Sequence, residues 1–259
     1  MRPPWRNLPP TPREELPWTS RLANGVAIAY AELGQGPPLL LLHGGYANGD
    51  YWGLQARALS RRHRVIVIDT RGHGRSDADE TPFSYDLFAS DVLGLVDLLG
   101  IRTFSVAGWS DGGIVALCVA LREPDRVTCI FALGVNASPA GLIDAGGRSP
   151  VFEAYRLRTS EEYAALSVTG IPFEDFRRRM HQLGDGQPDW IPPDLARISA
   201  RTVVAIGDHD EVIRRQHAGM MARAMPDARL LVLPATSHFA LIQAPALVTA
   251  AILDLLDGR

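Results

Sequence analysis

The sequence is poor in cysteine, in net charge and in long apolar runs, and each shortage excludes a class of protein. Two cysteines in 259 residues are too few for a disulfide framework. The 26 basic and 29 acidic residues give a formal net charge of -3, so no basic field indicates a nucleic acid or an anionic membrane as partner. No segment approaches the length of a membrane span, and the N-terminal stretch lacks the apolar core of a signal peptide. We therefore expect a cytoplasmic protein that acts on a small molecule.

Composition otherwise resembles that of an ordinary globular domain. The chain is 46% hydrophobic and 21% charged, which suffices for one large core. Cys118 and Cys129 fall inside apolar runs, where a free cysteine behaves as a small buried hydrophobe. The proline-rich residues 1–18 predict an extended tail, either lying on the surface or disordered. Nothing in the sequence indicates an oligomeric state.

Short apolar, β-branched runs alternate with helical patterns from residue 19 to residue 259. The last five or six runs are too unbroken to have one face in water, which is typical of strands covered on both sides. This alternation predicts an α/β fold with a doubly wound, mostly parallel central sheet. The runs begin at Gly25, Pro37, Arg64, Thr103, Arg126, Thr202 and Arg229, and helical patterns cover 51–60, 85–99, 112–121, 211–225 and 245–256.

Residues 137–198 break this rhythm. They contain no strand-like run and hold short amphipathic pieces, "SPVFEAYRL", "SEEYAALSV" and "FEDFRRRMHQL". We interpret them as a small helical cap inserted after one strand and lying over the carboxyl ends of the sheet.

One serine stands between two glycines in "GWSDG", residues 108–112, which fits the G-x-S-x-G nucleophile elbow. A strand-like run precedes it and a helical pattern follows, so Ser110 is expected on a sharp turn. Gly108 and Gly112 then leave room where strand and helix approach closely. The alternative is a plain helix cap, a position that serine and aspartate both favour, but a cap needs only one of these neighbours.

A nucleophilic serine requires a histidine base and a carboxylate that orients it. His238 follows the last strand-like run and is the expected base. Asp210, in "GDHDE" after another run, is the expected acid, because it lies further into its loop than Asp208. The competing position after the run from Arg126 holds Asn136, which is not a carboxylate. The chain order Ser110, Asp210, His238 is the one expected for this fold.

Backbone donors for an oxyanion are expected from the N–H of Asp111 and from the loop after "LLLLHGGY". Gly44 and Gly45 have no side chains, so a substrate oxygen can approach the backbone of that loop, and the N–H of Gly45 or Tyr46 is the expected second donor. A tight turn after a buried strand is the alternative interpretation of "HGG". Neither a cofactor nor a metal is expected, because "DHD" is an isolated cluster and "GWSDGG" does not match the dinucleotide fingerprint.

From about Ser20 to Leu256 the chain resembles the α/β-hydrolase superfamily. The resemblance rests on the elbow, on "HGG" and on "DTRGHGRSD", residues 69–77, where we interpret Asp69, Arg71 and Ser76 as structural. "GWSDGG" together with "RGHGRS" and a short insertion is most similar to the esterase and lactonase branch, which includes biphenyl-hydrolase-like valacyclovir hydrolases and enol-lactonases. In the valacyclovirase-like relatives, the resemblance implies that a carboxylate at the position of Asp111 attracts an α-amino group.

Asp111 has two possible orientations. Its carboxylate would repel a developing oxyanion by ~1 kcal/mol or more if it pointed at it. It is therefore expected either to be hydrogen-bonded to the protein or to face the pocket and attract a substrate cation. The candidate pocket residues are all large aromatics, and for those in the insertion the alternative is packing within the insertion itself. They are Trp109, Phe152, Tyr155, Phe173, Phe176 and Trp190.

These residues together predict a serine hydrolase that cleaves carboxylic esters or lactones through an acyl-enzyme. Other chemistry on the same three side chains remains open, namely C–C bond hydrolysis, perhydrolysis and amide hydrolysis. A hydrolase-fold receptor that uses its pocket to bind a ligand is the alternative from a different class.

Overall fold

The computed structural model describes residues 3–12, 14–143 and 149–258. Their centre is an eight-stranded sheet of order β1-β2-β4-β3-β5-β6-β7-β8. β1 and β2 are antiparallel to their neighbours, and the other strands run parallel. The predicted α/β fold with a mostly parallel sheet is confirmed. The strands are β1 (Trp18–Ala23), β2 (Val26–Leu33), β3 (Pro38–Leu42), β4 (Arg64–Ile68), β5 (Phe104–Trp109), β6 (Val127–Leu133), β7 (Arg201–Gly207) and β8 (Ala228–Leu233).

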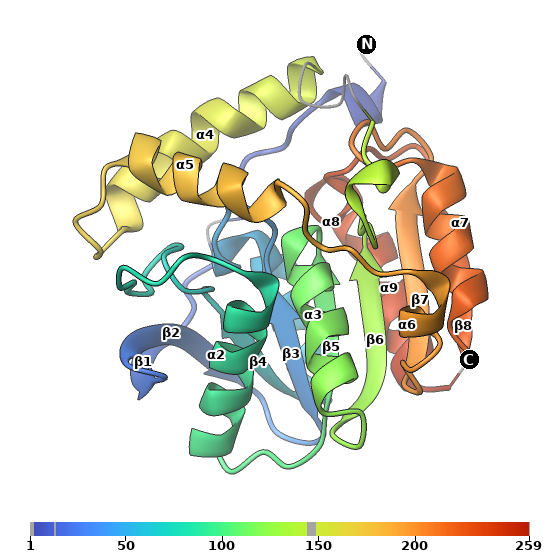
Figure 1. The fold of residues 1–259 in the computed structure, drawn as a ribbon, viewed down its shortest axis with the longest axis horizontal. Coiled ribbons are helices and arrows are strands. Elements are labelled where there is room, and N and C mark those ends of the chain that lie inside the picture. The colour runs from blue at the N-terminus through green and yellow to red at the C-terminus, as the bar shows by residue number, and fades with distance from the viewer. Residues whose placement is uncertain (1–2, 13, 144–148, 259) are drawn as a thin grey trace.

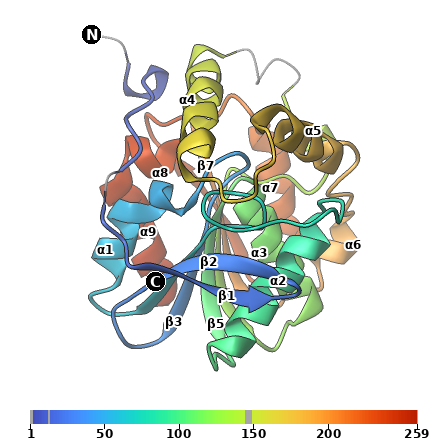
Figure 2. The same ribbon diagram turned by 90° about the vertical axis from the view of Figure 1, so that its left-hand side faces the viewer.

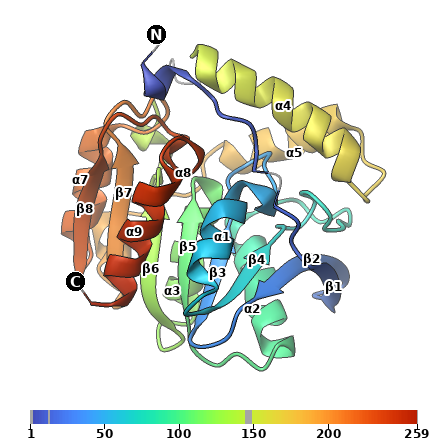
Figure 3. The ribbon, with the colours of Figure 1, turned by 180° about the vertical axis from the view of Figure 1, so that it is seen from behind.

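Helices cover both faces of this sheet. α2 and α3 lie on the face turned toward the viewer in Figure 1, and α1 and α9 lie on the opposite face, seen in Figure 3. Each layer buries an apolar core against the strands. The helices outside the insertion are α1 (Gly53–Leu59), α2 (Tyr85–Leu98), α3 (Asp111–Arg122), α7 (Arg215–Ala224), α8 (Ala240–Gln243) and α9 (Pro245–Leu256), with short 3-10 helices η1 (Pro4–Arg6) and η2 (Gly49–Trp52). A third 3-10 helix, η3 (Pro139–Gly141), lies at the start of the predicted insertion.

Two strands differ from the sequence prediction. β5 is buried along its whole length, as its unbroken apolar run predicts. β8 has an equally apolar run, yet it is an edge strand, and Leu230 is 38% exposed. β1 was not predicted, because its middle residues are polar and exposed and carry no apolar periodicity. Pairing with β2, rather than burial, fixes β1.

The insertion consists of helices α4 (Pro150–Leu166), α5 (Phe173–Gly184) and α6 (Pro192–Leu195). α4 and α5 lie beyond the carboxyl ends of the parallel strands, as Figures 1 and 2 show. Two of the short pieces expected from the sequence form the single helix α4. Residues 144–148 of the predicted insertion lie outside the described residues, and the boundaries 1–18 and 137–198 remain predictions.

The N-terminal segment crosses the surface in an extended form. Arg158 of α4 donates hydrogen bonds to the carbonyls of Leu8 and Pro9, and Gln243 of α8 donates one to the carbonyl of Asn7. The segment therefore links the insertion to the body of the fold. Among the described residues, no helix is both long enough and apolar enough to cross a membrane.

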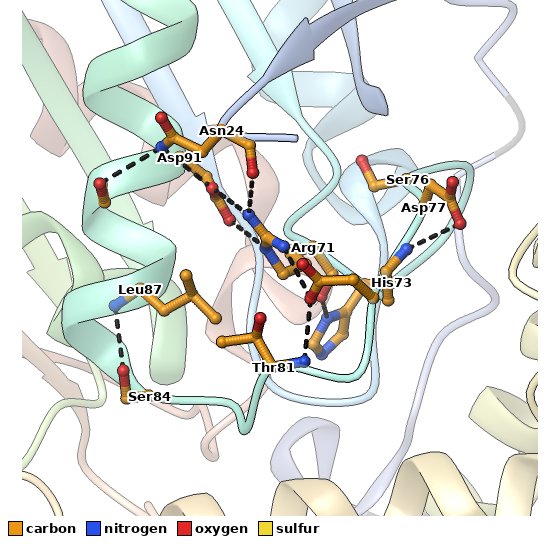
Figure 4. A network of polar contacts seen from close by, with 12 residues as sticks. Asn24, Arg71, His73, Ser76, Asp77, Thr81, Ser84, Leu87 and Asp91 are labelled. Carbon is orange, nitrogen blue, oxygen red and sulfur yellow. Dashed lines mark hydrogen bonds and ion pairs between the residues drawn. The ribbon is translucent and has the colours of Figure 1, made fainter. Parts of the chain in front are cut away.

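A buried ion pair fixes the turn that follows β4. Arg71 is 1% exposed and donates two hydrogen bonds of 2.7 Å to Asp91 of α2 and one of 3.1 Å to the carbonyl of Asn24 (Figure 4). The hydroxyl of Ser76 donates to the carbonyl of Asp69, whose carboxylate accepts the N–H of Gly49. The Nη1 atom of Arg71 forms an ion pair with Asp79 at 3.0 Å, so these charged groups have partners within the protein, which agrees with the structural roles expected for Asp69, Arg71 and Ser76.

Candidate active site

Ser110 lies on a strained turn between β5 and α3. Its φ of 53° and ψ of -124° fall in a region that residues other than glycine rarely occupy. Its N–H donates to the carbonyl of Leu133 at 2.8 Å, which holds the turn against β6. Ser110 occupies the N-cap position of α3, but its side chain makes no capping hydrogen bond. A capping role therefore does not explain this serine.

Glycines on either side let the turn pack closely. A Cβ at residue 108 would lie 2.3 Å from the carbonyl oxygen of Gly112, and a Cβ at residue 112 would lie 2.3 Å from the carbonyl oxygen of Leu42. A side chain at either position would force strand and helix apart. The sequence-based reason for these glycines agrees with the structure.

His238 and Asp210 form a buried pair on the loops after β8 and β7. The Nδ1 atom of His238 lies 3.1 Å from Oδ2 and 3.2 Å from Oδ1 of Asp210. The two side chains are 3% and 1% exposed. Oδ1 of Asp210 also accepts the N–H groups of Val212 and Ile213, both at 2.9 Å. These two backbone donors hold the carboxylate in the orientation in which it contacts the imidazole.

Electrostatics around His238 favour its charged form. Burial lowers the pKa of the imidazole, but the carboxylates of Asp210, Glu211 and Asp111 raise it, and the net result is a raised pKa. The two competing acid positions bond groups other than the imidazole of His238. Asp208 is exposed and accepts the N–H of Thr236, while Asn136 donates to the carbonyl of Ser138.

The loop after β3 packs directly against the turn at Ser110. A Cβ at residue 44 would lie 3.1 Å from the Cβ of Ser110, and Tyr46 has a positive φ of 64°. The ring of His43 fixes the loop, since Nδ1 donates to the carbonyl of Gly44 and Nε2 accepts the N–H of Thr70. Burial lowers the pKa of His43 to about 4, so the ring is neutral, as these two bonds require.

A cavity of about 310 Å³ joins these parts below the insertion. Ser110 and His238 line it together with the predicted donors Asp111, Gly45 and Tyr46. Three of the expected aromatic pocket residues, Trp109, Phe152 and Tyr155, line it as well. The cavity thus has an apolar wall beside the hydroxyl and the imidazole.

The other three aromatics expected in the pocket, Phe173, Phe176 and Trp190, are not among the residues that line it. Phe176 stacks on Tyr163 with ring centroids 4.6 Å apart, and Phe173 lies 5.5 Å from the same ring. Trp190 donates its backbone N–H to the carbonyl of Ala137. Phe173 therefore packs within the insertion, as the alternative interpretation has it. The ring of Phe176 also lies 4.8 Å from that of His73, outside the insertion, and Trp190 packs against the core of the fold.

Sequence reasoning missed several residues that line the cavity. The polar ones include Tyr85 of α2, His181 of α5, and Asp185 and Gln187, which follow α5, and the apolar ones include Met180 and Ile213. Phe176 and Met180 are four residues apart on α5 and face inward, so helical periodicity offered a signal for Met180. No local pattern signals Tyr85, because the long loop after β4 brings it to the site.

Asp111 combines the two orientations expected from the sequence. Its Oδ1 accepts the hydroxyl of Tyr85 at 3.0 Å, and its side chain also lines the cavity. Burial raises the pKa of Asp111, which the hydrogen bond from Tyr85 and the proximity of His238 oppose. Among the described residues, no group of three or more His, Cys, Asp or Glu side chains is arranged to hold a metal ion.

Comparison with known proteins identifies the family. A family model described as the alpha/beta hydrolase fold matches residues 37–148. A putative carbamate hydrolase, RutD, from Azorhizobium caulinodans is 39% identical over 233 residues, covering 80% of this chain and 86% of the relative. The chain belongs to the α/β-hydrolase superfamily.

Two further relatives agree with this membership. The serine hydrolase BPHL of Homo sapiens is 29% identical over 228 residues, covering 83% of this chain and 78% of the relative. The crystal structure of an enol-lactonase from Burkholderia xenovorans superposes on this α/β-hydrolase with a TM-score of 0.77 at 22% identity, covering 92% of this chain and all (100%) of the lactonase. That likeness shows a shared fold, and the relatives together support a hydrolase.

Proposed function

We propose that this α/β-hydrolase cleaves carboxylic esters or lactones with Ser110 as the nucleophile. One observation carries the proposal: Ser110, on a strained turn and without a capping bond, lines the same cavity as an imidazole that is paired with a buried carboxylate. A hydroxyl beside a histidine that a third group orients is the arrangement that activates serine for attack.

The mechanism assigns one role to each group. Ser110 Oγ attacks the carbonyl carbon while His238 accepts the hydroxyl proton, and Asp210 holds the imidazole in the tautomer that this requires. The N–H of Asp111 and that of Gly45 or Tyr46 stabilise the oxyanion. His238 then protonates the leaving oxygen, the C–O bond breaks, and an acyl-Ser110 ester remains. Water, deprotonated by His238, hydrolyses this ester and regenerates the hydroxyl.

The names of the relatives indicate which classes of substrate to test. They include a putative carbamate hydrolase and an enol-lactonase. Carbamates, esters and lactones share an electrophilic carbonyl bonded to a leaving oxygen, so all three suit the same groups. The cavity volume of about 310 Å³ is at the small end for ligand pockets, which favours compact acyl groups.

The test is a substrate panel run with three proteins. p-Nitrophenyl esters of increasing acyl length, simple lactones and a p-nitrophenyl carbamate are assayed with the wild type, Ser110→Ala and Ser20→Ala. Ser20 lies on exposed β1 and serves as the control. We expect turnover of short esters or lactones that falls by ~10⁴-fold or more in Ser110→Ala and is unchanged in Ser20→Ala.

Two results would overturn the proposal. Turnover that survives in Ser110→Ala would exclude this serine as the nucleophile. Stoichiometric ligand binding with no turnover in the wild type would favour the receptor alternative.

A further inference from the structure

The main chain of His238 is held from both sides. Its carbonyl oxygen accepts the indole Nε1–H of Trp109 at 2.8 Å, and its N–H donates to Oε2 of Glu211 at 3.1 Å. Trp109 immediately precedes Ser110, and Glu211 immediately follows Asp210. The neighbours of two proposed catalytic residues therefore hold the backbone of the third.

The indole of Trp109 has little freedom to move. Trp109 is 1% exposed, and its ring lies 5.6 Å from that of Tyr51, 5.8 Å from that of Tyr155 and 5.7 Å from that of Phe239. A ring packed on several sides presents its N–H in one direction without further ordering. The turn that carries Ser110 thereby fixes the distance to the loop that carries His238.

Glu211 makes a second connection, to the insertion. Its Oε1 accepts the hydroxyl of Ser149 at 3.3 Å, and Ser149 in turn caps α4 by accepting the N–H of Phe152 at 3.0 Å. Phe152 lines the cavity. One carboxylate thus joins the start of the cap helix to the backbone of His238.

We propose that Trp109 and Glu211 are positioning residues that hold the main chain of His238 in register with Ser110 and Asp210. The inference rests on the proposed function, since it assigns His238 the role of base. It extends that function by naming two residues outside the Ser, His and Asp set on which the geometry of the imidazole depends.

Glu211 has an electrostatic effect beside its hydrogen bond. The charged groups that act on His238 are Asp210, Glu211 and Asp111, and those that act on Glu211 are His238 and Asp210. Burial raises the pKa of Glu211, and the nearby His238 opposes that shift. A carboxylate at this position stabilises the imidazolium that forms during the reaction.

Substitutions can separate the charge of Glu211 from its hydrogen bond. Glu211→Gln retains an acceptor oxygen for the N–H of His238 but removes the charge, and Glu211→Ala removes both. Trp109→Phe removes the indole donor and keeps a smaller aromatic ring in its place. Asp208→Asn is the matched control. It removes a carboxylate from the same loop, but this carboxylate accepts the N–H of Thr236 and not that of His238.

Two measurements are made on each variant. The first is the pKa of the His238 imidazole, from NMR titration of the ring protons, which needs no substrate. The second is the rate at which Ser110 reacts with a fluorophosphonate, together with kcat and KM on any ester that the wild type hydrolyses. Failure of the proposed function would appear as absent labelling and turnover in the wild type, while the NMR titration would still test the inference.

We expect Glu211→Gln to lower the pKa of His238, because one of the carboxylates that raise it is lost, with little change in the rate at high pH. Glu211→Ala and Trp109→Phe should lower kcat by ~10-fold or more with KM nearly unchanged, since both loosen the base. Asp208→Asn should match the wild type.

An unchanged pKa of His238 in Glu211→Gln together with wild-type rates in Glu211→Ala would overturn the role of Glu211. A wild-type rate in folded Trp109→Phe would overturn that of Trp109. If thermal unfolding shows Trp109→Phe to be unfolded, Trp109→His and Trp109→Ala take its place. Trp109→His retains a ring N–H and is expected to keep more activity than Trp109→Ala. Equal rates in these two variants would overturn the positioning role of Trp109.

Discussion

The hydroxyl of Tyr85 donates a hydrogen bond to Oδ1 of Asp111 at 3.0 Å, from a different helix and across the wall of the cavity. Oδ2 of the same carboxylate lies where a Cβ at residue 45 would be only 2.4 Å away. Tyr85 and Gly45 therefore fix the carboxylate beside the oxyanion loop, with part of its surface in the cavity. A fixed anion at this place is suited to a substrate cation.

Asp111→Asn should lower kcat/KM selectively for esters that carry an α-amino group. Removing the carboxylate removes the attraction for an ammonium but keeps an acceptor for Tyr85, so neutral esters should be little affected. We expect a loss of ~10-fold for a valine ester relative to the matched isovalerate ester. Asp86→Asn, on the exposed side of α2, is the control. An equal effect on both esters would show that Asp111 does not recognise the cation.

The rate of Ser110 acylation should rise with pH through the pKa of His238. The imidazole must be neutral to accept the hydroxyl proton, and its pKa is raised above the usual 6.5, because the nearby carboxylates outweigh burial. The acidic limb of the kcat/KM profile should therefore have its midpoint above pH 6.5. Asp210→Asn should move this midpoint to lower pH and reduce the plateau by ~10³-fold or more. A limb centred well below pH 6.5 in the wild type would contradict this electrostatic picture.

The sheet and the site differ in how much of them the sequence could predict. Unbroken apolar runs and the signature around Ser110 are local, so β5, α3 and the sharp turn were predicted from a few adjacent residues. The edge position of β8 and the strand β1 were not, because pairing partners and exposure are set by the whole sheet. Tyr85, Met180 and His181 reach the cavity from remote segments, and only the packing of the helices decides which of their faces line it.

Gly134→Ala should impair catalysis beyond its effect on stability. Residue 134 has a φ of +63°, and a Cβ there would lie 2.9 Å from the ring of His238. Gly100→Ala is the matched control, since residue 100 has a φ of +67° but nothing within 4 Å of the added atom. Both variants should lose ~1 kcal/mol of unfolding free energy from backbone strain. In addition, Gly134→Ala should lose ~10-fold or more in kcat, and equal activity in the two variants would exclude crowding of the imidazole.

Arg71→Met should destabilise the fold strongly, because it leaves Asp91 buried without its partner. Breaking one half of a buried pair typically costs ~3–5 kcal/mol. The double variant with Asp91→Leu should recover part of that loss, since no buried charge is left unpaired. Asp79, which also forms an ion pair with Arg71, is exposed. Arg156→Met removes an exposed ion pair with Glu153 and should leave chemical unfolding close to that of the wild type. A double variant as unstable as Arg71→Met would show that packing, and not the buried charge, dominates.

Two buried histidines should make the fold less stable as the pH falls. Burial lowers the pKa of His43 to about 4 and that of His73 to about 3. Below about pH 6.5 these two histidines therefore bind protons in the unfolded chain while they stay neutral in the folded protein. Their stabilisation is complete above pH 6.5 and is lost as the pH falls toward these values. Burial raises the pKa of Asp69 to about 6, which acts in the opposite direction between pH 6 and 3.8.

Urea unfolding of variants can isolate what single groups contribute to the pH dependence. Each proton of difference changes the unfolding free energy by ~1.4 kcal/mol per pH unit, so the two histidines against the one carboxyl contribute a loss of ~1.4 kcal/mol per unit as the pH falls from 6 to 5. His73→Gln removes one of the two histidine contributions and should flatten this part of the curve. His181→Gln, on the exposed end of α5, is the control for the loss of an imidazole from the surface. Parallel curves for His73→Gln and the wild type would mean that His73 takes up a proton in the folded protein, and that the loop after β4 admits water.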